Sequence, residues 1–421
     1  MVLKVDRAVD FGFIHDLVAD LYCADNGRPA LDPTQLFKIL LLGYLFGIRS
    51  ERQLMREIQV NMAYRWFVGL SMTDKVPDAS TLSQNRRRRF DESDVYQQIF
   101  DEIVLQAMNK NLITGTCLYT DSTHLKANVN KGKWVKSQVE QSRRDYLDDL
   151  DKAVTEDRRS HGKKPLKAKD DTPTIREIKQ STTDPDSGYM VRDGKPKGFF
   201  YLDHRTVDGR HNMITDVHVT PGNVHDSLPY LSRLKRQRDR FGLDVHTVGL
   251  DAGYFTAGVC HGLEQEGIYA VVSYRRPTHR KGYFYKRQFE YDLEKNIYRC
   301  PQGETLRYST TDRNGYRHYK SDPEVCRNCP VRNKCTQNKQ AQKTVTRHVW
   351  EGDKEKINQH RLTPYGKSVY KQRKETVERS FADAKELHLY RYARYRGLNK
   401  VQGQCLMVAA AQNIKKMALV S

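Results

Sequence analysis

Three acidic residues, far apart in the chain, are suited to holding metal ions together. Asp121 ends an apolar run at residues 117–120, Asp251 ends another at residues 248–250, and Glu378 lies on an expected helix. Hard divalent cations prefer carboxylate oxygens, and strand ends together with a helix face are rigid places to mount them. Two such ions about 4 Å apart can catalyse phosphoryl transfer. The three carboxylates therefore predict a two-metal phosphoryl-transfer site.

The composition indicates a polyanionic partner. Lys and Arg number 72 against 52 Asp and Glu, a net charge of +20, and a basic surface of that size attracts phosphate backbones. The apolar run at residues 36–48 is interrupted by Lys38 and is shorter than the roughly 20 residues of a membrane helix. The N-terminal residues lack the pattern of a secretory signal. We expect a nucleic-acid-binding, cytoplasmic protein with reduced thiols and no membrane segment.

Four of the eight cysteines cluster and could bind zinc. A Cys-x2-Cys pair with two further thiols nearby is typical of a structural Zn²⁺ site, because four thiolates complete a tetrahedron. One of the four is separated from the pair by a long segment, so four unligated thiols remain the alternative. The residues concerned are Cys300, Cys326, Cys329 and Cys335.

The first part of the chain is typical of short helices joined by tight turns. Asp32 or Thr34 can cap a helix opened by Pro33, a second helix is expected near Ser50, and a third spans residues 80–90. This arrangement predicts a helix-turn-helix-like DNA-binding module. The third helix ends in four consecutive arginines that could contact phosphates; a solvated helix face is the alternative. They are Arg86, Arg87, Arg88 and Arg89.

The pattern changes to strands and helices after residue 115. The expected order is three strands, a helix, a strand, a helix and a strand, followed by the helix that carries Glu378. An Asp-Gly turn at residues 208–209 predicts a hairpin between the second and third strands. The highly charged residues 131–180 are expected to form an exposed helix and a mobile loop. Asp226 is expected to cap the helix that follows the third strand, with a DNA or metal role as the alternative.

Aromatic and basic side chains alternate just after the helix that carries Glu378. Such a composition can hold phosphates and stack bases, although a strand that covers the core would look similar. The basic members of this segment at residues 388–396 are Arg391, Arg394 and Arg396.

Acidic residues at the first and fourth strands and on the last helix resemble the ribonuclease H fold. Several collinear segments resemble the DDE transposases of bacterial insertion sequences, and the N-terminal and four-cysteine segments are similar to the IS-eleven-eighty-two-like branch. The resemblance covers nearly the whole chain. The segments are YTDSTH, DGRHNMITDVHVTPGNVHDS, LDAGYF, RKETVERSFADAK and RPALDPTQLFKILLLGYLFGIRSERQL.

The resemblance implies that Asp121, Asp251 and Glu378 hold two Mg²⁺ ions, for which Mn²⁺ can substitute. It implies cleavage of DNA at the terminal repeats of an element, transfer into target DNA, and a homodimer as the working complex, in a bacterial, nucleoid-associated setting. Related enzymes carry a Tyr-x2-Arg-x3-Glu-x6-Lys signature, of which Lys385 is in register. Tyr370 and Arg373 come one position too early, and Lys374, four residues before Glu378, is the expected basic partner.

Three alternatives to this interpretation remain open. They are a catalytically inactive transposase-derived DNA-binding protein, a ribonuclease H-like nuclease that acts on other nucleic acids, and a zinc-ribbon regulator that would leave the carboxylates idle. The expected fold class is α/β, a ribonuclease H-like mixed sheet with flanking helices. The expected domains are an all-α DNA-binding domain at 1–112, a catalytic core at 113–275 with a charged helical insertion at about 130–197, a small inserted four-cysteine subdomain at 276–350, and a helical part of the core at 351–421.

Overall fold

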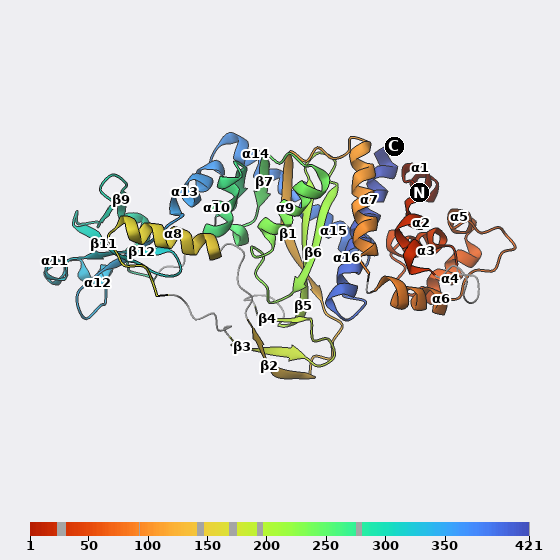
Figure 1. The fold of residues 1–421 in the computed structure, drawn as a ribbon, viewed down its shortest axis with the longest axis horizontal. Helices are drawn as coiled ribbons and strands as arrows, with labels where there is room; N and C mark the ends of the chain where they lie inside the picture. The colour runs from red at the N-terminus through yellow and green to blue at the C-terminus, as the bar shows by residue number, and fades with distance from the viewer. Residues whose placement is uncertain are drawn as a thin grey trace.

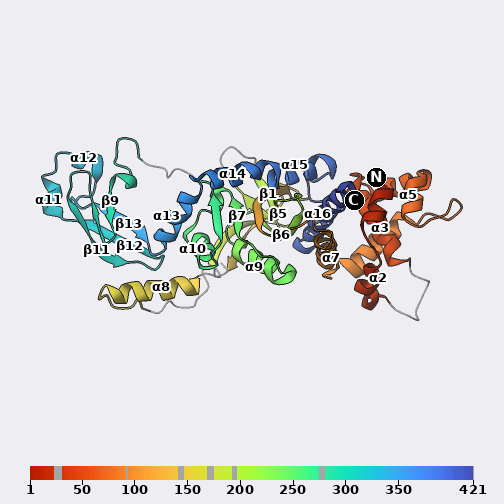
Figure 2. The same ribbon diagram turned by 90° about the horizontal axis from the view of Figure 1, so that it is seen from above.

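The computed structural model shows an elongated molecule with a helical part, a central mixed sheet and a distal sheet in a row (Figure 1). The chain begins in the helical part and also ends against it, so that both termini lie near each other in the two views (Figures 1 and 2). The mixed α/β class expected from the sequence is confirmed. The structure describes residues 1–22, 31–91, 93–140, 147–167, 175–191, 197–274 and 280–420.

The described residues before 112 form helices and no strand. Local capping explains where two of them begin: the Asp32 carboxylate accepts from Gln35 N at 3.0 Å, with Pro33 at the first helical position, and Ser50 Oγ accepts from Gln53 N. The arginine run does not continue α6, because residues 86–90 form a separate π-turn. The elements are α1 Val2–Ala8, α2 Phe13–Val18, η1 Ala19–Leu21, α3 Pro33–Leu45, α4 Glu51–Val60, α5 Met62–Phe67, α6 Ala79–Asn85, η2 Arg86–Phe90 and α7 Val95–Asn109.

The central sheet brings two of the three acidic residues to one edge. Its strand order is β6-β5-β1-β7-β8, with β4 also beside β5. β1 and β7 run parallel, with Thr120 opposite Leu250, so the residues after these positions lie side by side. The expected sequence of strands and helices is confirmed. The elements are β1 Cys117–Lys126, β4 Gly188–Met190, β5 Gly198–Asp208, β6 Ile214–Pro221, α9 Tyr230–Phe241, β7 Thr247–Leu250, η3 Ala252–Tyr254, α10 Ala257–Gln265 and β8 Tyr269–Val272.

The C-terminal helices close the central sheet and join it to the helical part. α16 is buried along most of its length and lies between β6 and α7 (Figures 1 and 2). Asn413 stabilises the packing of α16 on β6, because its side chain accepts a hydrogen bond from Ile214 N and donates one to Ile214 O, both at 2.8 Å. The elements are α13 Glu351–His360, α14 Pro364–Gln372, η5 Arg373–Glu375, α15 Val377–Leu387 and α16 Leu398–Val420.

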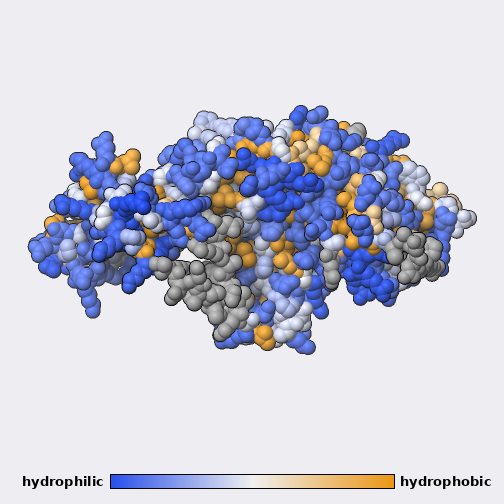
Figure 3. Space-filling model, viewed as in Figure 1, coloured by the Kyte–Doolittle hydropathy of each residue, from blue (hydrophilic) through white to orange (hydrophobic). Residues whose placement is uncertain are grey.

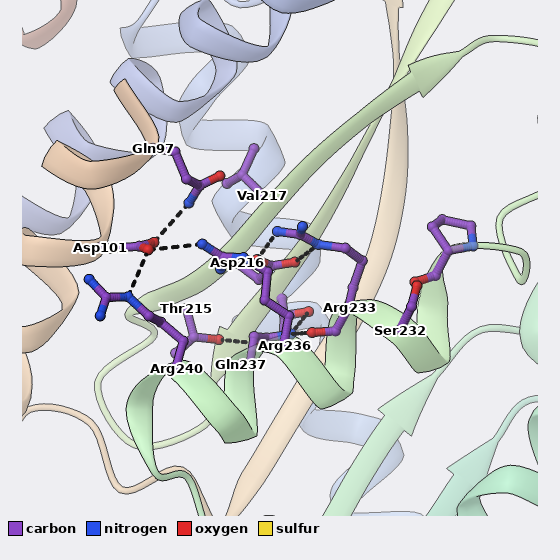
Figure 4. A network of polar contacts seen from close by, with 12 residues as sticks. Gln97, Asp101, Thr215, Asp216, Val217, Ser232, Arg233, Arg236, Gln237 and Arg240 are labelled. Atoms are coloured by element: carbon purple, nitrogen blue, oxygen red, sulfur yellow. Dashed lines mark hydrogen bonds and ion pairs between the residues drawn. The ribbon is translucent and has the colours of Figure 1, made fainter. Parts of the chain in front are cut away.

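A polar network provides a second connection between α7 and the sheet (Figure 4). The Asp101 carboxylate on α7 accepts from Arg236 at 2.8 Å and from Arg240 at 3.1 Å, both on α9. Asp216 on β6, also buried, pairs with Arg233 at 2.8 Å. Each buried carboxylate is therefore paired with arginine, as burial of a charge requires.

The prediction of a helix and a loop for the charged residues 131–180 is wrong in one respect. Residues 131–180 contain a two-stranded antiparallel ribbon in addition to a helix, so Val135 belongs to a strand and is 49% exposed. The strand begins with Trp134 and Val135, an aromatic and a β-branched residue of the kind that favours strands. Tyr146, which falls within this expected helical region, lies outside the described residues. The elements are β2 Trp134–Glu140, α8 Leu147–Ser160 and β3 Ile175–Ser181.

The distal sheet contains five antiparallel strands in the order β13-β12-β11-β10-β9. Its own core is small and consists of Phe289, Tyr298, Leu306, Tyr319 and Val345. α8 packs on it through Asp157, whose carboxylate accepts from Thr311 Oγ1 and from Arg317. The elements are η4 Lys286–Gln288, β9 Glu290–Asp292, β10 Ile297–Arg299, β11 Thr305–Thr311, β12 Tyr316–Ser321, α11 Pro323–Arg327, α12 Arg332–Cys335 and β13 Thr344–His348.

We expect His218 to lower the stability of the protein in acid. Burial, together with smaller effects of Arg233, His204 and Arg236, lowers the pKa of His218 to about 3. The unfolded chain therefore binds a proton at about pH 6.5 that the folded chain does not, so stability present above that pH is lost as the pH falls towards 4. The free energy of unfolding should fall by about 1 kcal/mol per pH unit from this group. Denaturant titration of His218→Gln should show a correspondingly flatter pH dependence; an unchanged slope would contradict the assignment.

Candidate active site

Asp121 and Asp251 converge because each directly follows the last register pair of the parallel strands β1 and β7. Thr120 and Leu250, the residues immediately before them, are register partners. Backbone amides orient both carboxylates: Ser122 N donates to Asp121 Oδ1 at 2.8 Å, and Gly253 N donates to Asp251 Oδ1 at 2.6 Å. The second contact opens the short turn η3 directly after β7. The Oδ1 atoms of Asp121 and Asp251 are therefore held in place by backbone amides of the protein itself.

The electrostatic environment of Asp121 is unusual for a carboxylate. Its pKa is raised to about 6, because burial and the repulsion from Asp251 and Asp226 together outweigh the lowering effect of the Arg373 guanidinium. Like charges in a partly buried space are unfavourable unless cations neutralise them. The site therefore favours binding of positive charge.

Glu378 is connected to Asp121 through Arg373. One guanidinium nitrogen of Arg373 lies 2.6 Å from Asp121 Oδ2, and another lies 3.7 Å from Glu378 Oε1. The Arg373 side chain is only 4% exposed. All three acidic residues singled out in the sequence therefore border one region.

Lys374 does not occupy the position that helical spacing indicates. Residues 373–375 form a 3-10 turn, and Thr376, with φ −109° and ψ −96°, separates this turn from α15. Lys374 and Glu378, although four residues apart, therefore do not lie on one face of a single helix. Arg373 reaches the carboxylates, whereas Lys374 is exposed. The break adds one residue between Arg373 and Glu378. This explains why Arg373 comes one position earlier than the signature of related enzymes requires.

Lys385 approaches the same edge from the next turns of α15. Its ammonium donates to Thr123 Oγ1 at 2.7 Å. Thr123 lies two residues after Asp121 on β1 and therefore on the same face of the strand. The structure thus places Lys385 beside the carboxylates, as its spacing from Glu378 indicated.

Arg205 fixes the helix that carries Glu378 to the sheet. It is the register partner of Asp121 and is fully buried. Its guanidinium donates to Ser380 Oγ at 3.0 Å, to Gln412 Oε1 at 2.7 Å and to Asp203 Oδ2 at 2.7 Å. One side chain therefore connects β5, α15 and α16. Its burial could not be read from the sequence, where arginine normally indicates a surface position.

Asp226 is a site residue that sequence reasoning assigned to another role. The expectation that it caps a helix is wrong, because α9 begins at Tyr230. Asp226 Oδ1 accepts from Ser122 Oγ at 2.9 Å. A Cβ at Gly253 would lie 3.0 Å from Asp251 Oδ1 and 3.4 Å from Asp226 Oδ2, so these two carboxylates approach across that glycine. The only sequence signal was its position in a segment that resembles related proteins.

Tyr254 lies close to the three carboxylates of Asp121, Asp226 and Asp251. It is fully buried, and its hydroxyl has no hydrogen-bond partner in the described part of the chain. Its pKa lies well above the usual range, because of burial and the negative charges of Asp121, Asp226 and Asp251. A buried hydroxyl without a partner is unfavourable, and here it borders three carboxylates.

The four clustered cysteines line a common cavity of about 30 Å³ at one end of the distal sheet. Burial raises the pKa of Cys335, Lys343 lowers it, and the other three thiols of the cluster raise it. Gln302 N donates to Cys300 Sγ at 3.4 Å. Tertiary folding therefore brings the isolated Cys300 to the Cys-x2-Cys pair. The four thiols are Cys300, Cys326, Cys329 and Cys335.

The four consecutive arginines have different surroundings. Arg86 pairs with Glu51 at 3.6 Å and with Asp91 at 3.5 Å, and Arg89 donates to Leu21 O. Both guanidinium groups are therefore occupied inside the protein. Arg87 and Arg88 are exposed, and phosphate contact stays a prediction for them.

The aromatic and basic segment after α15 is not a strand that covers the core. It makes a single bridge between Tyr392 and Lys126. Arg391 pairs with Glu386, Arg396 donates to Asn128 O at 2.9 Å, and Arg394 lies over the Tyr44 ring. The segment thus connects β1 with the helical part.

Two negative findings apply to the described residues only. Among them, no three His, Cys, Asp or Glu side chains are already arranged as a metal-binding group. Within the same ranges, no helix is both long and apolar enough to span a membrane.

Two family models match separate parts of the chain. Residues 299–418 match the family "Transposase DDE domain", and residues 1–88 match "Transposase domain (DUF772)". The first match includes Glu378, Lys385 and the four cysteines, whereas Asp121 and Asp251 lie between the two matches. A search of curated proteins finds no significant match.

Solved structures with significant similarity include two kinds of transposase. A piggyBac transposase synaptic complex with hairpin DNA is 10% identical, covers 99% of this chain and 77% of its own, and has a TM-score of 0.32. A Mos1 transposase paired-end complex with the left transposon end is 12% identical, with 60% and 62% covered and a TM-score of 0.18.

Proposed function

We propose that the chain is a DDE transposase and that Asp121, Asp251 and Glu378 are its metal-binding triad, with Mg²⁺ as the ion. The observation that carries this proposal is the convergence of the three carboxylates on one sheet edge, with Arg373 within ion-pair distance of two of them. The strand order, with Asp121 on the central strand and Asp251 on its parallel neighbour, supports a ribonuclease H-like core.

The side chains around the triad suit DNA strand cleavage and transfer. When bound, two divalent ions activate the attacking oxygen and stabilise the leaving oxygen. Lys385 offers a cation beside Thr123 for a non-bridging phosphate oxygen. Arg373 neutralises the carboxylates from the protein side. The preorganised amide contacts of Asp121 and Asp251 hold their oxygens in place. We further propose DNA ends and target DNA as substrates, a homodimer that cuts two ends together, and a cytoplasmic, nucleoid-associated location.

Cleavage of DNA that carries the ends of the protein's own element tests this proposal. The purified protein should cut at the element boundary with Mg²⁺ or Mn²⁺ and not with EDTA, and Asp121→Ala should not cut with either ion. Tight binding of those ends without cleavage would instead favour the inactive DNA-binding derivative. Cleavage of unrelated RNA or branched DNA at equal rates would favour a nuclease of the same fold.

We also propose that Asp226 is a fourth carboxylate of the metal centre. It approaches Asp251 across Gly253 and borders the unpartnered Tyr254 hydroxyl. Asp226→Asn should weaken Mn²⁺ binding, measured by calorimetry without DNA, by roughly tenfold, since one charge is removed. Asp239→Asn, on the exposed side of α9, is the matched control. Equal affinities for both variants would remove Asp226 from the metal centre.

The four-cysteine cavity is proposed to hold one structural Zn²⁺. Thiolates are its preferred ligands in closed tetrahedral sites, and the small core of the distal sheet would gain stability from such a site. Protein purified without chelator should contain about one zinc per chain by elemental analysis. Cys329→Ser should lose it, whereas Cys260→Ser, a buried cysteine of α10, should keep it. Equal zinc content in both variants would contradict the assignment.

A further inference from the structure

A large cationic groove lies between the N-terminal helices and the segment that follows α15. Its volume is about 920 Å³, and it is lined by α4, by the residues that lead into α6, and by Arg394 and Tyr395. The corresponding surface over α6 is strongly hydrophilic (Figure 3). We call it the arginine groove; its basic residues are Arg49, Arg52, Arg56, Lys75 and Arg394.

The two carboxylates in the groove leave its five basic residues in excess, although Asp78 interacts electrostatically with Arg52 and Lys75. Glu51 pairs with Arg86, and Asp78 accepts from Ser80 N at 2.7 Å as the cap of α6. Within the described parts of the chain, Arg52, Arg56 and Lys75 make no ion pair. The groove therefore presents a concentrated positive charge, which favours a polyanion.

The spacing of the exposed arginines fits a repeating anion. Arg52 and Arg56 are exposed on α4 and lie one turn apart on one face, about 6 Å along the helix. That distance is close to two steps of duplex DNA, at about 3.4 Å each. A small anion would occupy only one such position.

Arg394 supplies an independent observation. Its guanidinium lies 4.9 Å from the Tyr44 ring centroid, and its Nη2 atom is buried without a hydrogen-bond partner in the described residues. Buried donors are normally satisfied. The Nη2 atom itself is closed to solvent, so Arg394 contributes its positive charge to the groove wall rather than a contact through that nitrogen.

The groove is connected to the proposed metal site through one strand. Ala393 N donates to Lys126 O at 2.9 Å, and Lys126 lies five residues after Asp121 on β1, about 17 Å along the strand. A duplex that reaches both places must extend over about five base pairs. We propose that the arginine groove binds the backbone of duplex DNA at least this far from the bond that is cut; this deepens the proposed function and rests on it.

Fluorescence anisotropy with a labelled duplex of arbitrary sequence tests the groove. Arg52→Glu/Arg56→Glu should weaken binding at least roughly tenfold, and the slope of log affinity against log salt should fall by about 2 between about 50 and 200 mM salt. The matched control is Lys4→Glu/Arg7→Glu, two exposed residues of α1 in the same helical part. It should change affinity by less than about twofold. Equal losses in the two variants would overturn the proposal.

Further experiments distinguish a groove that binds duplex DNA from a site that binds a small anion. Arg394→Met should weaken duplex binding, whereas competition by millimolar inorganic phosphate alone would indicate a small-anion site and overturn the DNA assignment. Circular dichroism checks the fold, with Arg52→Gln/Arg56→Gln as a milder variant expected to show a smaller loss. The control Lys4→Glu/Arg7→Glu should cut at the normal rate. If the wild-type chain binds but never cuts, the groove stands while the proposed function fails.

Discussion

Asp251→Asn is expected to reduce metal-dependent DNA cleavage by at least roughly 10³-fold while leaving DNA affinity unchanged. The substitution keeps the shape of the side chain, and the amide oxygen of asparagine can still accept from Gly253 N, which Asp251 Oδ1 now does at 2.6 Å. The turn after β7 should therefore be retained. The negative charge that attracts the cations is lost, and several kcal/mol of transition-state stabilisation go with it.

Gel-based cleavage and anisotropy on the same preparation measure the two effects. Asp244→Asn is the matched control, because this carboxylate is 83% exposed before β7 and contacts only His246 among the described residues. The control should cut normally. Cleavage by Asp251→Asn within tenfold of the wild-type rate would exclude Asp251 from the triad.

Arg205→Met is expected to destabilise the fold by about 3 kcal/mol. The substitution removes the hydrogen bonds that Arg205 donates to Ser380 and Gln412 and leaves the fully buried Asp203 carboxylate without its cation. Removing one partner of a buried ion pair is costly because the other charge remains buried. Tyr390 still donates to Asp203 at 2.9 Å, which limits the loss.

Thermal and denaturant unfolding measure this effect. Adding Asp203→Asn to Arg205→Met should restore part of the stability, because it removes the uncompensated charge. Arg379→Met is the control, since Arg379 is an exposed residue of α15 that, among the described residues, pairs only with Glu375; it should change stability by less than about 0.5 kcal/mol. Equal losses of stability for Arg205→Met and Arg379→Met would contradict the role of Arg205 in connecting β5 with α15 and α16.

Helix breaks and side-chain burial limited what the sequence could predict about the site. Helical spacing pointed to Lys374, but it assumes an unbroken helix, and the turn at Thr376 shifts Arg373 into contact with Asp121. Asp226 was assigned to a cap because its neighbours in sequence precede a helix. Its partner, Ser122, is 104 residues away in the chain, so no local pattern could reveal the contact.

The sequence by itself determined the order of strands and helices and the positions of Asp121, Asp251 and Glu378 within it. These follow from local periodicity and from capping residues such as Asp32 and Ser50, which act within a few positions of the chain. Only the tertiary structure decided which cations meet those carboxylates, how Cys300 joins the other thiols, and that an arginine is buried beneath α15. Those contacts join segments far apart in sequence, and their energies depend on burial and distance, which composition and spacing do not contain.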